Sequence, residues 1–358
     1  MTAGWRNNLI RLDPYRAGEQ PKSADVIKLN ANENPYPPAP GVYAAVRGLE
    51  CEGLRRYPSA DGGGLRRALA AYHGLDEGEV FVGNGSDEIL ALAFRAFFNS
   101  GSPVLFPDVT YSFYPVWCRL FGIAYETRGL AEDFSARVDD YKGENGGVVL
   151  ANPNAPTGVC LPDGGVERLM RRNGGASVVI IDEAYIDFGG VSSVGLVREF
   201  ENLLVVQTFS KGRALAGMRL GMAFGSPALI SVLEAVKNSF NSYPVDSVAE
   251  AAGIASIEDD AYFRARAGQV AATRDRVAGQ MRGMGFRLTD SRANFLFAAH
   301  PDIDAEALKA HLGGRGILVR HFRLPGIERH LRISVGTDAE MDALLEGIRE
   351  FMECFSAM

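Results

Sequence analysis

Lys211 is the first residue whose type and position suggest chemistry. It lies in the stretch VVQTFSKGRALAGMRLG, residues 205–221, where an apolar run ends and a segment rich in glycine and alanine begins. The chain has only six lysines among its 37 basic residues. An amine can lose its proton and attack a carbonyl carbon, whereas a guanidinium in practice cannot. Lys211 is therefore a candidate nucleophile.

Three other stretches also place polar side chains next to apolar runs. SVVIID (177–182) continues into DEAY, GVVLAN (147–152) continues into NPNAPTG, and the loop GNGSDE (83–88) precedes an apolar, helix-like run. In open parallel sheets, ligands bind at the carboxyl ends of the strands. Each feature alone has an ordinary explanation, since an Asp or a Lys after a strand is commonly a helix cap or a solvated end. Together they indicate side chains that converge on one site.

This combination of side chains matches what pyridoxal phosphate requires of a protein. The cofactor needs a lysine for its aldehyde, a carboxylate for its pyridine nitrogen, donors for its ring hydroxyl and a cationic nest for its phosphate. Lys211 and Asp182 are candidates for the first two, and GNGSDE resembles part of a phosphate loop at a helix amino end. The same loop is equally compatible with an ordinary helix start, because Asp87 and Glu88 suit that position.

The elements that must position these residues form an alternating pattern from about Gly83 to Gly225. Short β-branched apolar runs alternate there with longer helix-like stretches, which is typical of a parallel sheet with crossover helices. Most of these runs are apolar throughout, which implies burial on both faces. A helix is expected at 86–98, and strands are expected at 104–106, 147–152, 177–182, 203–209 and 219–224.

The two ends of the chain differ from this central part. From about Val245, a long amphipathic helix at 247–285 and strands within 286–299, 316–322 and 330–336 predict a second, smaller α+β unit. The opening segment around LNANENPYPPAPG is dense in Asn and Pro, so we expect an extended arm that lies over another surface. The predicted division is an arm at 1–40 that joins the small domain, a large cofactor-binding domain at 41–245 and a small domain at 246–358.

Composition excludes several classes of protein. A chain of 358 residues with 47% hydrophobic and 23% charged residues is expected to form about two soluble domains with a sizeable core. A net charge of −7 argues against a nucleic-acid surface. No secretory signal or transmembrane run is found, so we expect a cytoplasmic protein without membrane contact. No metal site or disulfide framework is indicated by the widely spaced cysteines, which are Cys51, Cys118, Cys160 and Cys354.

The order of motifs along the whole chain resembles the fold type I aminotransferases, and within them most closely the histidinol-phosphate aminotransferases. The motifs are LNANENP, RYP, GNGSDE, PDVTYSFY, NPNAPTG, DEAYIDF, TFSKGRALAGMRLG, ANFLF and HLRISVGT. The resemblance implies an α/β fold, in which a large domain has a mostly parallel seven-stranded sheet between helices and a smaller domain is α+β. It also implies a ping-pong Schiff-base transamination between histidinol phosphate and 2-oxoglutarate in histidine biosynthesis, by a cytoplasmic homodimer.

The same resemblance implies roles for individual residues. Lys211 would hold pyridoxal phosphate as a Schiff base and then move the proton between the substrate and the cofactor. Asp182 would pair with the pyridine nitrogen, and Tyr185 would donate to the ring hydroxyl oxygen. Tyr111 would stack on the ring. The phosphate and the rest of the cofactor would be held by Gly85, Ser86, Asp87, Asn154, Ser210 and Arg219, with Tyr57 reaching in from the partner subunit of the homodimer.

Two arginines are implied to bind the substrates. Arg332 in HLRISVG would grip the acidic end of glutamate or of a phosphorylated amino alcohol or amino acid, and Arg320 in LVRHF would assist it. A planar guanidinium suits a carboxylate or a phosphate, because it can donate two parallel hydrogen bonds. Tyr15 and Asn32, both in the opening arm, would close over the substrate.

One position departs from the pattern of the family. Relatives read NPNNPTG, and the second Asn of that motif donates to the ring hydroxyl, whereas this chain has Ala155 there. Either Asn154 turns inward and replaces the missing donor, or Tyr185 together with a water molecule replaces it. We expect the ring oxygen to be less well stabilised as an anion, so that the Schiff base keeps its proton to higher pH.

Other functions share parts of this pattern. An aromatic amino-acid aminotransferase and a decarboxylase acting on a phosphorylated amino acid such as threonine phosphate would use the same cofactor cradle. A nucleotide-binding dehydrogenase is disfavoured because GNGSDE lacks the third glycine of G-x-G-x-x-G. A metal hydrolase is disfavoured because none of the five histidines forms a close ligand pair with another.

Overall fold

The larger of two sheets contains the five strands predicted between residues 104 and 224. The computed structural model describes residues 4–15, 19–20 and 25–356. The strands of the larger sheet are β2 (Val80–Gly83), β3 (Val104–Pro107), β4 (Tyr125–Arg128), β5 (Gly147–Ala151), β6 (Val179–Asp182), β7 (Leu203–Thr208) and β8 (Gly221–Gly225). Among the described residues this sheet has seven strands, in the order β2-β8-β7-β6-β5-β3-β4. β8 runs antiparallel to both neighbours, and the other neighbouring pairs are parallel.

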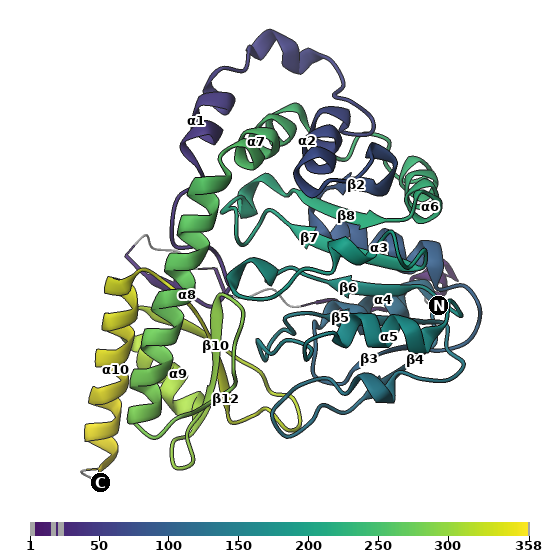
Figure 1. The fold of residues 1–358 in the computed structure, drawn as a ribbon. Coiled ribbons are helices and arrows are strands. Elements are labelled where there is room, and N and C mark those ends of the chain that lie inside the picture. Colours follow the sequence, from purple (N-terminus) through teal and green to yellow (C-terminus); the bar gives the residue numbers. More distant parts are fainter. Residues whose placement is uncertain (1–3, 16–18, 21–24, 357–358) are drawn as a thin grey trace.

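Helices cover both faces of this sheet because its central strands are apolar at nearly every position. Successive side chains of a strand point to opposite faces, so Val149 and Ile180 pack in one core while Val148 and Val179 pack in the other. The first core is closed by α3 (Gly85–Phe97), α4 (Phe113–Phe121) and α6 (Pro227–Asn238), and the second by α2 (Gly63–His73), α5 (Gly165–Asn173) and α7 (Ser247–Glu258). Figure 1 shows the sheet between these layers.

The smaller sheet combines the opening segment with the end of the chain. Its strands are β1 (Ile27–Leu29), β9 (Arg287–Leu288), β10 (Phe295–Ala299), β11 (Ile317–His321) and β12 (His330–Ser334), in the order β1-β11-β12-β10-β9. The sheet packs against α8 (Asp260–Gly283), α9 (Ala305–Gly314) and α10 (Asp338–Ser356) through one apolar cluster. β1 lies parallel to β11, which places the segment after β1 beside the large sheet.

The predicted fold class is confirmed, since a mostly parallel seven-stranded sheet between helices is accompanied by a smaller α+β unit. The long helix expected at 247–285 is instead two helices, α7 and α8, which meet at Asp259. The Asp259 carboxylate accepts a hydrogen bond from the Gly41 backbone N–H at 2.7 Å, beside α1 (Pro40–Arg47). Three strands were not predicted, namely β1, β2 and β4. The domain boundaries at 40/41 and 245/246 stay a prediction.

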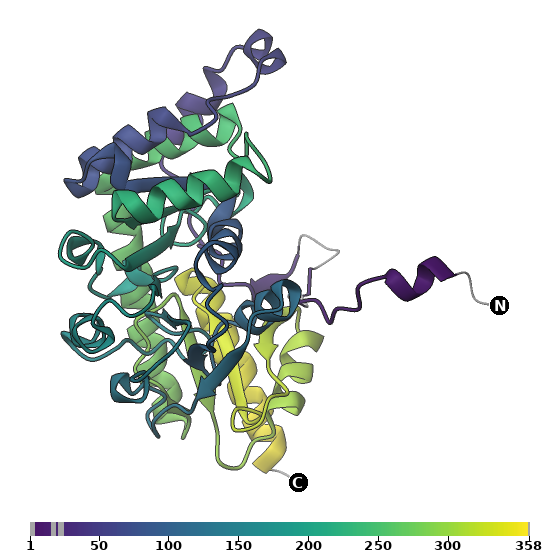
Figure 2. The ribbon, with the colours of Figure 1, turned by 90° about the vertical axis from the view of Figure 1, so that its right-hand side faces the viewer.

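The described part of the amino-terminal segment projects away from the body of the molecule (Figure 2). It begins with a short 3-10 helix at Gly4–Asn8, and the side chains of Trp5, Leu9 and Ile10 are exposed. In the part of the chain that the structure describes, six further 3-10 turns connect the main elements, at Cys51–Arg55, Glu77–Glu79, Val138–Asp140, Ile186–Phe188, Val194–Leu196 and Ala216–Met218. Among the described residues, no helix combines the length and apolar character that crossing a membrane requires.

Candidate active site

A cavity of about 380 Å³, here named the strand-end pocket, lies where β5, β6 and β7 end and where α3 begins. Its opposite wall is formed by residues 30–33, which follow β1, and by β11 and β12. Elements of both sheets therefore enclose it. The predicted site residues that line it are Tyr15, Asn32, Ser86, Asp87, Tyr111, Asp182, Tyr185, Ser210, Lys211, Arg219, Arg320 and Arg332.

Lys211 lies three residues after the end of β7 and reaches into this pocket. Its Nζ donates a hydrogen bond to the backbone oxygen of Ala31 at 3.1 Å and lies 5.9 Å from the centre of the Tyr185 ring. Burial, together with the positive charge of Arg332, lowers the pKa of Lys211 from its ordinary 10.5 to about 8. A much larger fraction of this amine is therefore neutral, and nucleophilic, near pH 8 than that of an ordinary lysine.

Asp182 is the last residue of β6 and is only 4% exposed. Burial raises the pKa of this carboxyl to about 6, although two hydrogen bonds oppose that rise. The Tyr114 hydroxyl donates to Oδ2 at 2.8 Å, and the Ala184 backbone N–H donates to Oδ1 at 3.2 Å. These donors favour the ionised form, so Asp182 can present a negative charge to a positively charged group in the pocket.

The start of α3 and the residues around Arg219 form a concave, positively polarised corner. Gly85, the first residue of α3, has a left-handed φ of 82°, and a Cβ at this position would lie 2.8 Å from Arg219 Nη2. A Cβ on Gly221 would lie 2.5 Å from the backbone nitrogen of Ser86. Both positions therefore need glycine for this close approach. A helix amino end beside a guanidinium attracts anions.

Two aromatic side chains form another wall of the pocket. The Tyr111 hydroxyl donates to Asp87 Oδ1 at 2.7 Å, which holds the Tyr111 ring in place. Burial, with the neighbouring Asp87 charge, raises the pKa of Tyr111 well above its usual value, so it stays neutral. Tyr15 stacks on Phe113 with ring centres 4.3 Å apart.

Arg332 and Arg320 occupy the small-sheet side of the pocket and are paired across β11 and β12. Arg332 Nη2 donates to the backbone oxygen of Asn30 at 3.2 Å, whereas its Nε is buried and has no partner among the described residues. Its guanidinium carbon lies 5.5 Å from the centre of the Phe295 ring, and burial lowers its pKa. A buried guanidinium with a free donor is suited to bind an anion.

Three predicted residues lie outside the lining of this pocket. Gly85 adjoins it through Arg219, as described above. The cofactor-binding role of Asn154 stays a prediction: its amide donates to Val109 O at 2.9 Å and to Thr157 Oγ1 at 3.1 Å, and its Oδ1 accepts from Thr110 at 2.8 Å. These bonds hold the loop after β5.

Tyr57 is 81% exposed and stacks on Tyr243, with ring centres 4.6 Å apart. It does not reach the strand-end pocket of its own chain. Its predicted role in the site of a partner subunit stays a prediction.

Asn32 lines the pocket, but its side chain is engaged. Its Nδ2 donates to the Tyr185 hydroxyl at 3.0 Å, and its Oδ1 accepts from the Ser334 hydroxyl at 2.9 Å. Its amide is therefore hydrogen-bonded at both ends within the protein, and the expectation that Asn32 closes over a substrate stays a prediction.

Sequence reasoning missed several residues of this site. Tyr114 could have been considered because it lies in PDVTYSFY, the motif that also contains Tyr111. Ser334 could have been considered because it lies two residues after Arg332 on one strand face. The backbone oxygen of Ala31, which accepts from Lys211, carries no signal in the sequence.

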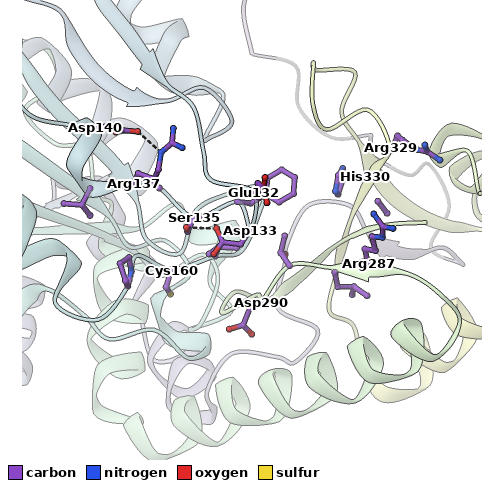
Figure 3. A pocket seen from close by; sticks show the side chains of 18 of the residues that line it. Glu132, Asp133, Ser135, Arg137, Asp140, Cys160, Arg287, Asp290, Arg329 and His330 are labelled. Atoms are coloured by element: carbon purple, nitrogen blue, oxygen red, sulfur yellow. Dashed lines mark hydrogen bonds and ion pairs between the residues drawn. The ribbon is translucent and has the colours of Figure 1, made fainter. Parts of the chain in front are cut away.

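A larger cavity of about 1030 Å³ lies elsewhere and is here named the loop cleft. Figure 3 shows charged side chains around it, among them Arg137, Asp133 and Arg287. Arg137 Nε pairs with Asp140 at 2.8 Å, and no lysine lines the cleft among the described residues. Burial raises the pKa of the Cys160 thiol to about 11, which keeps it unreactive. Neither a lysine nor an activated thiol is therefore found among the described residues that line the loop cleft.

Comparisons with known proteins agree with this geometry. A family model described as "Aminotransferase class I and II" matches residues 24–348. The chain is 52% identical over 355 residues to histidinol-phosphate aminotransferase 1 of Burkholderia pseudomallei, covering 98% of this chain and 99% of that protein. It is 49% identical over 349 residues to histidinol-phosphate aminotransferase of Lactococcus lactis subsp. cremoris, covering 98% of each.

Solved structures show the same similarity in three dimensions. A putative histidinol-phosphate aminotransferase of Erwinia carotovora atroseptica superposes with a TM-score of 0.85 at 25% identity, covering 94% of this chain and 99% of that one. Histidinol-phosphate aminotransferase of Sinorhizobium meliloti, solved with pyridoxal 5'-phosphate, superposes with a TM-score of 0.82 at 26% identity, covering 91% of each chain.

Proposed function

Because the chain belongs to the class I and II aminotransferases, which depend on pyridoxal phosphate, we propose that it transfers an amino group between histidinol phosphate and 2-oxoglutarate. The substrate is the one named for relatives of about half-identical sequence. The observation that carries the proposal is the convergence of Lys211, Asp182 and Arg332 on the strand-end pocket. The proposed pathway is histidine biosynthesis.

The residues present fit pyridoxal phosphate. Lys211 would hold its aldehyde carbon, Asp182 its pyridine nitrogen and Tyr185 its ring oxygen. The corner at Gly85 and Arg219, which a Cβ would fill, would hold its phosphate together with Ser210 and Ser86. When bound, the cofactor supplies an electron-withdrawing ring that takes up the electron pair left on the substrate carbon after that carbon loses a proton.

Lys211 is proposed to carry the proton of the reaction. With its pKa lowered to about 8, the Nζ atom can accept a proton from the substrate carbon and return it to a neighbouring atom at neutral pH. The hydrogen bond to the Ala31 backbone oxygen orients the amine toward the pocket. The same group would then act in both half-reactions.

Asp182 and the two arginines are proposed to orient the reactants. Tyr114 stabilises the ionised form of Asp182, so that this carboxylate can keep the ring nitrogen protonated. Arg332, assisted by Arg320, would bind the carboxylate of glutamate in one half-reaction and the phosphate of histidinol phosphate in the other. Both ligands are anions, which is why one guanidinium pair can serve both.

We also propose a cytoplasmic homodimer whose subunits share active sites. Support comes from the 81% exposure of Tyr57 and from the exposed apolar side chains of Trp5, Leu9 and Ile10. All four cysteines are free thiols, which fits a reducing compartment.

The substrate is tested with single half-reactions. The cofactor-loaded protein is mixed separately with histidinol phosphate, phenylalanine, tyrosine and phosphothreonine, and the loss of the visible absorbance band is followed. We expect the ratio of the half-reaction rate constant to the dissociation constant to be largest for histidinol phosphate. Preferential reaction of phenylalanine, or release of carbon dioxide from phosphothreonine, would replace the proposed substrate.

Shared sites are tested by mixing two inactive variants, Tyr57→Ala and Lys211→Ala. In a mixed dimer, the subunit that keeps Lys211 receives Tyr57 from the other subunit, so one complete site is restored. Recovery of activity after subunit exchange supports sharing. An unchanged, inactive mixture in which mass spectrometry detects mixed dimers would show that Tyr57 does not act across the interface.

A further inference from the structure

The segment of residues 30–34 links the small sheet to the chemical groups of the strand-end pocket. The backbone oxygen of Asn30 accepts from Arg332, and that of Ala31 accepts from Lys211. Asn34 Nδ2 donates to the backbone oxygens of Lys211 at 3.0 Å and Gly212 at 3.1 Å. This segment therefore positions the lysine from both of its ends.

Asn32, at the centre of the segment, is held in one orientation. It is 1% exposed and has a left-handed φ of 55°, which Asn tolerates better than most residues. Its backbone N–H donates to Ser334 Oγ at 2.8 Å, and the Ser334 hydroxyl donates back to Asn32 Oδ1 at 2.9 Å. Asn294 Nδ2 donates to the Asn32 backbone oxygen at 2.9 Å. Because Oδ1 faces Ser334, Nδ2 must face Tyr185.

The Tyr185 hydroxyl consequently accepts a hydrogen bond from Asn32 and keeps its own proton free. In the part of the chain that the structure describes, no protein group accepts that proton. The apolar cluster beside the Tyr185 ring consists of Ala155, Ala293 and Phe295, none of which has a side-chain donor. A hydroxyl that accepts one hydrogen bond donates a stronger one, because the two bonds polarise each other.

Of the charges near Tyr185, that of Arg332 acts on the hydroxyl in the same sense as the Asn32 amide, whereas those of Asp182 and Asp87 act in the opposite sense. Burial raises the pKa of Tyr185, while Arg332 and the hydrogen bond from Asn32 lower it and the negative charges of Asp182 and Asp87 raise it. Asn32 is thus the neutral group that favours proton donation by Tyr185 without adding a charge to the pocket.

We propose that Asn32, locked by Ser334, is a positioning residue that aims the Tyr185 hydroxyl at the ring oxygen of the cofactor and strengthens it as a donor. The inference rests on the proposed function of Tyr185. It also explains how a chain with Ala155 beside this ring orients its ring-oxygen donor. The contact of Ser334 with Asn32 and of Asn32 with Tyr185 is here called the relay. Ser334 and Arg332 lie two residues apart on β12, so one strand face holds both the relay and the arginine that is proposed to bind the substrate.

The test is a pH titration of the visible band of the cofactor-loaded protein. A hydrogen-bond donor stabilises the ring oxygen as an anion, which makes it easier for the lysine-linked nitrogen to lose its proton. Losing the donor therefore raises the pH at the midpoint of the titration. Asn32→Gly removes the amide and keeps the left-handed backbone without strain. We expect its midpoint to rise by about half a pH unit to one pH unit, which corresponds to the free energy of one hydrogen bond. Ser334→Ala should raise it by less.

A double-variant cycle separates the relay from general effects. If Asn32 acts through Tyr185, Asn32→Gly adds no shift when Tyr185→Phe is already present. Asn32→Asp, which places an acceptor opposite the hydroxyl, should shift the midpoint at least as much as Tyr185→Phe. Equal shifts from Asn32→Gly with and without Tyr185→Phe, or no shift at all, would overturn the proposal.

Ser291→Ala is the matched control. Ser291 is a buried serine of the same region, whose hydroxyl donates to the Phe295 backbone oxygen at 2.6 Å and which does not line the strand-end pocket. Its removal should lower the thermal midpoint of the protein and leave the spectral midpoint unchanged. If the unsubstituted protein forms no visible band, the roles proposed for Lys211 and Tyr185 fail; if it does and Asn32→Gly is silent, only the relay fails.

Discussion

The strand-end pocket is smaller than the loop cleft, yet its ionisable groups have the more strongly shifted pKa values. The cleft has a volume of about 1030 Å³ and the pocket about 380 Å³. In the pocket, burial brings the pKa of Lys211 down to about 8 and that of Asp182 up to about 6. In the cleft, exposed charges such as Arg137 and Asp140 pair with one another and remain solvated. Desolvation of a few groups, rather than volume, marks the site of chemistry.

The two regions also differ in what holds their side chains. Groups of the pocket project from the ends of buried strands and from the start of a 13-residue helix. Much of the cleft is lined by the connection around residues 132–140 and by the residues after β9. Strands with fully buried cores hold side chains more rigidly than loops do, and rigid placement is what positions catalytic groups.

The largest expected contrast comes from the lysine. Lys211→Ala should lower kcat by at least about 10³-fold, because it removes the proposed proton carrier. The control is Lys237→Ala, which removes a buried lysine whose Nζ donates to Ala60 O at 2.6 Å, far from the pocket. Mass spectrometry after borohydride reduction should find the cofactor attached to Lys211 in the control. Attachment to any other lysine would contradict the assignment.

Asp182→Asn should lower kcat by about 10²- to 10³-fold, since a neutral amide cannot keep the ring nitrogen protonated. Glu183→Gln is the neighbouring control: Glu183 is also buried, with a pKa raised by burial to about 7, but it bonds to Ser192 and Gln207 outside the pocket. Steady-state rates at saturating substrate measure both. A larger loss for Glu183→Gln would reverse their proposed roles.

Arg332→Lys should raise KM for glutamate by about ten- to a hundredfold, because a single ammonium cannot reproduce a two-pronged grip on a carboxylate. Arg329→Lys changes a nearby arginine that lines the loop cleft instead. We expect its KM to match that of the unsubstituted protein. An effect of similar size at both positions would mean that the cleft also takes part in substrate binding.

The rate of cofactor uptake by the cofactor-free protein should depend on pH through Lys211. The neutral amine is the reactive form, and its fraction rises with pH until the pKa of about 8 is passed. The rate constant should therefore rise by about tenfold per unit below pH 8 and level off above it. Stopped-flow absorbance measures this. A rate that keeps rising to pH 10 would indicate an ordinary, solvated lysine.

Tyr114→Phe should have the smallest effect, lowering kcat by about three- to tenfold, which corresponds to one hydrogen bond to a carboxylate. Its hydroxyl donates to Asp182 Oδ2 at 2.8 Å, so losing it raises the pKa of Asp182 further. The acid limb of the pH–rate profile should move to higher pH as a result. A profile that is lowered uniformly without moving would point to a packing defect instead.

Much of the site was predictable because its chemistry follows the ends of recognisable strands. Asp182 ends an apolar run that becomes β6, and Lys211 follows one that becomes β7. The carboxyl ends of parallel strands lie at one edge of a sheet, so the convergence of these residues could be inferred from the sequence. The hydrogen bonds of the Asn154 side chain were not predictable, because the same reasoning gives the position of a loop residue but not the direction of its side chain.

The sequence by itself determined most of the buried strands and which polar residues stand at their ends, since apolar periodicity and chain order carry that information. Only the tertiary structure decided that Asn32 meets Ser334, 302 residues away, and turns its amide to Tyr185. It also decided that the helix breaks at Asp259 and that Tyr114 supports Asp182. These contacts depend on backbone angles and side-chain directions between distant segments, which no local pattern of residues specifies.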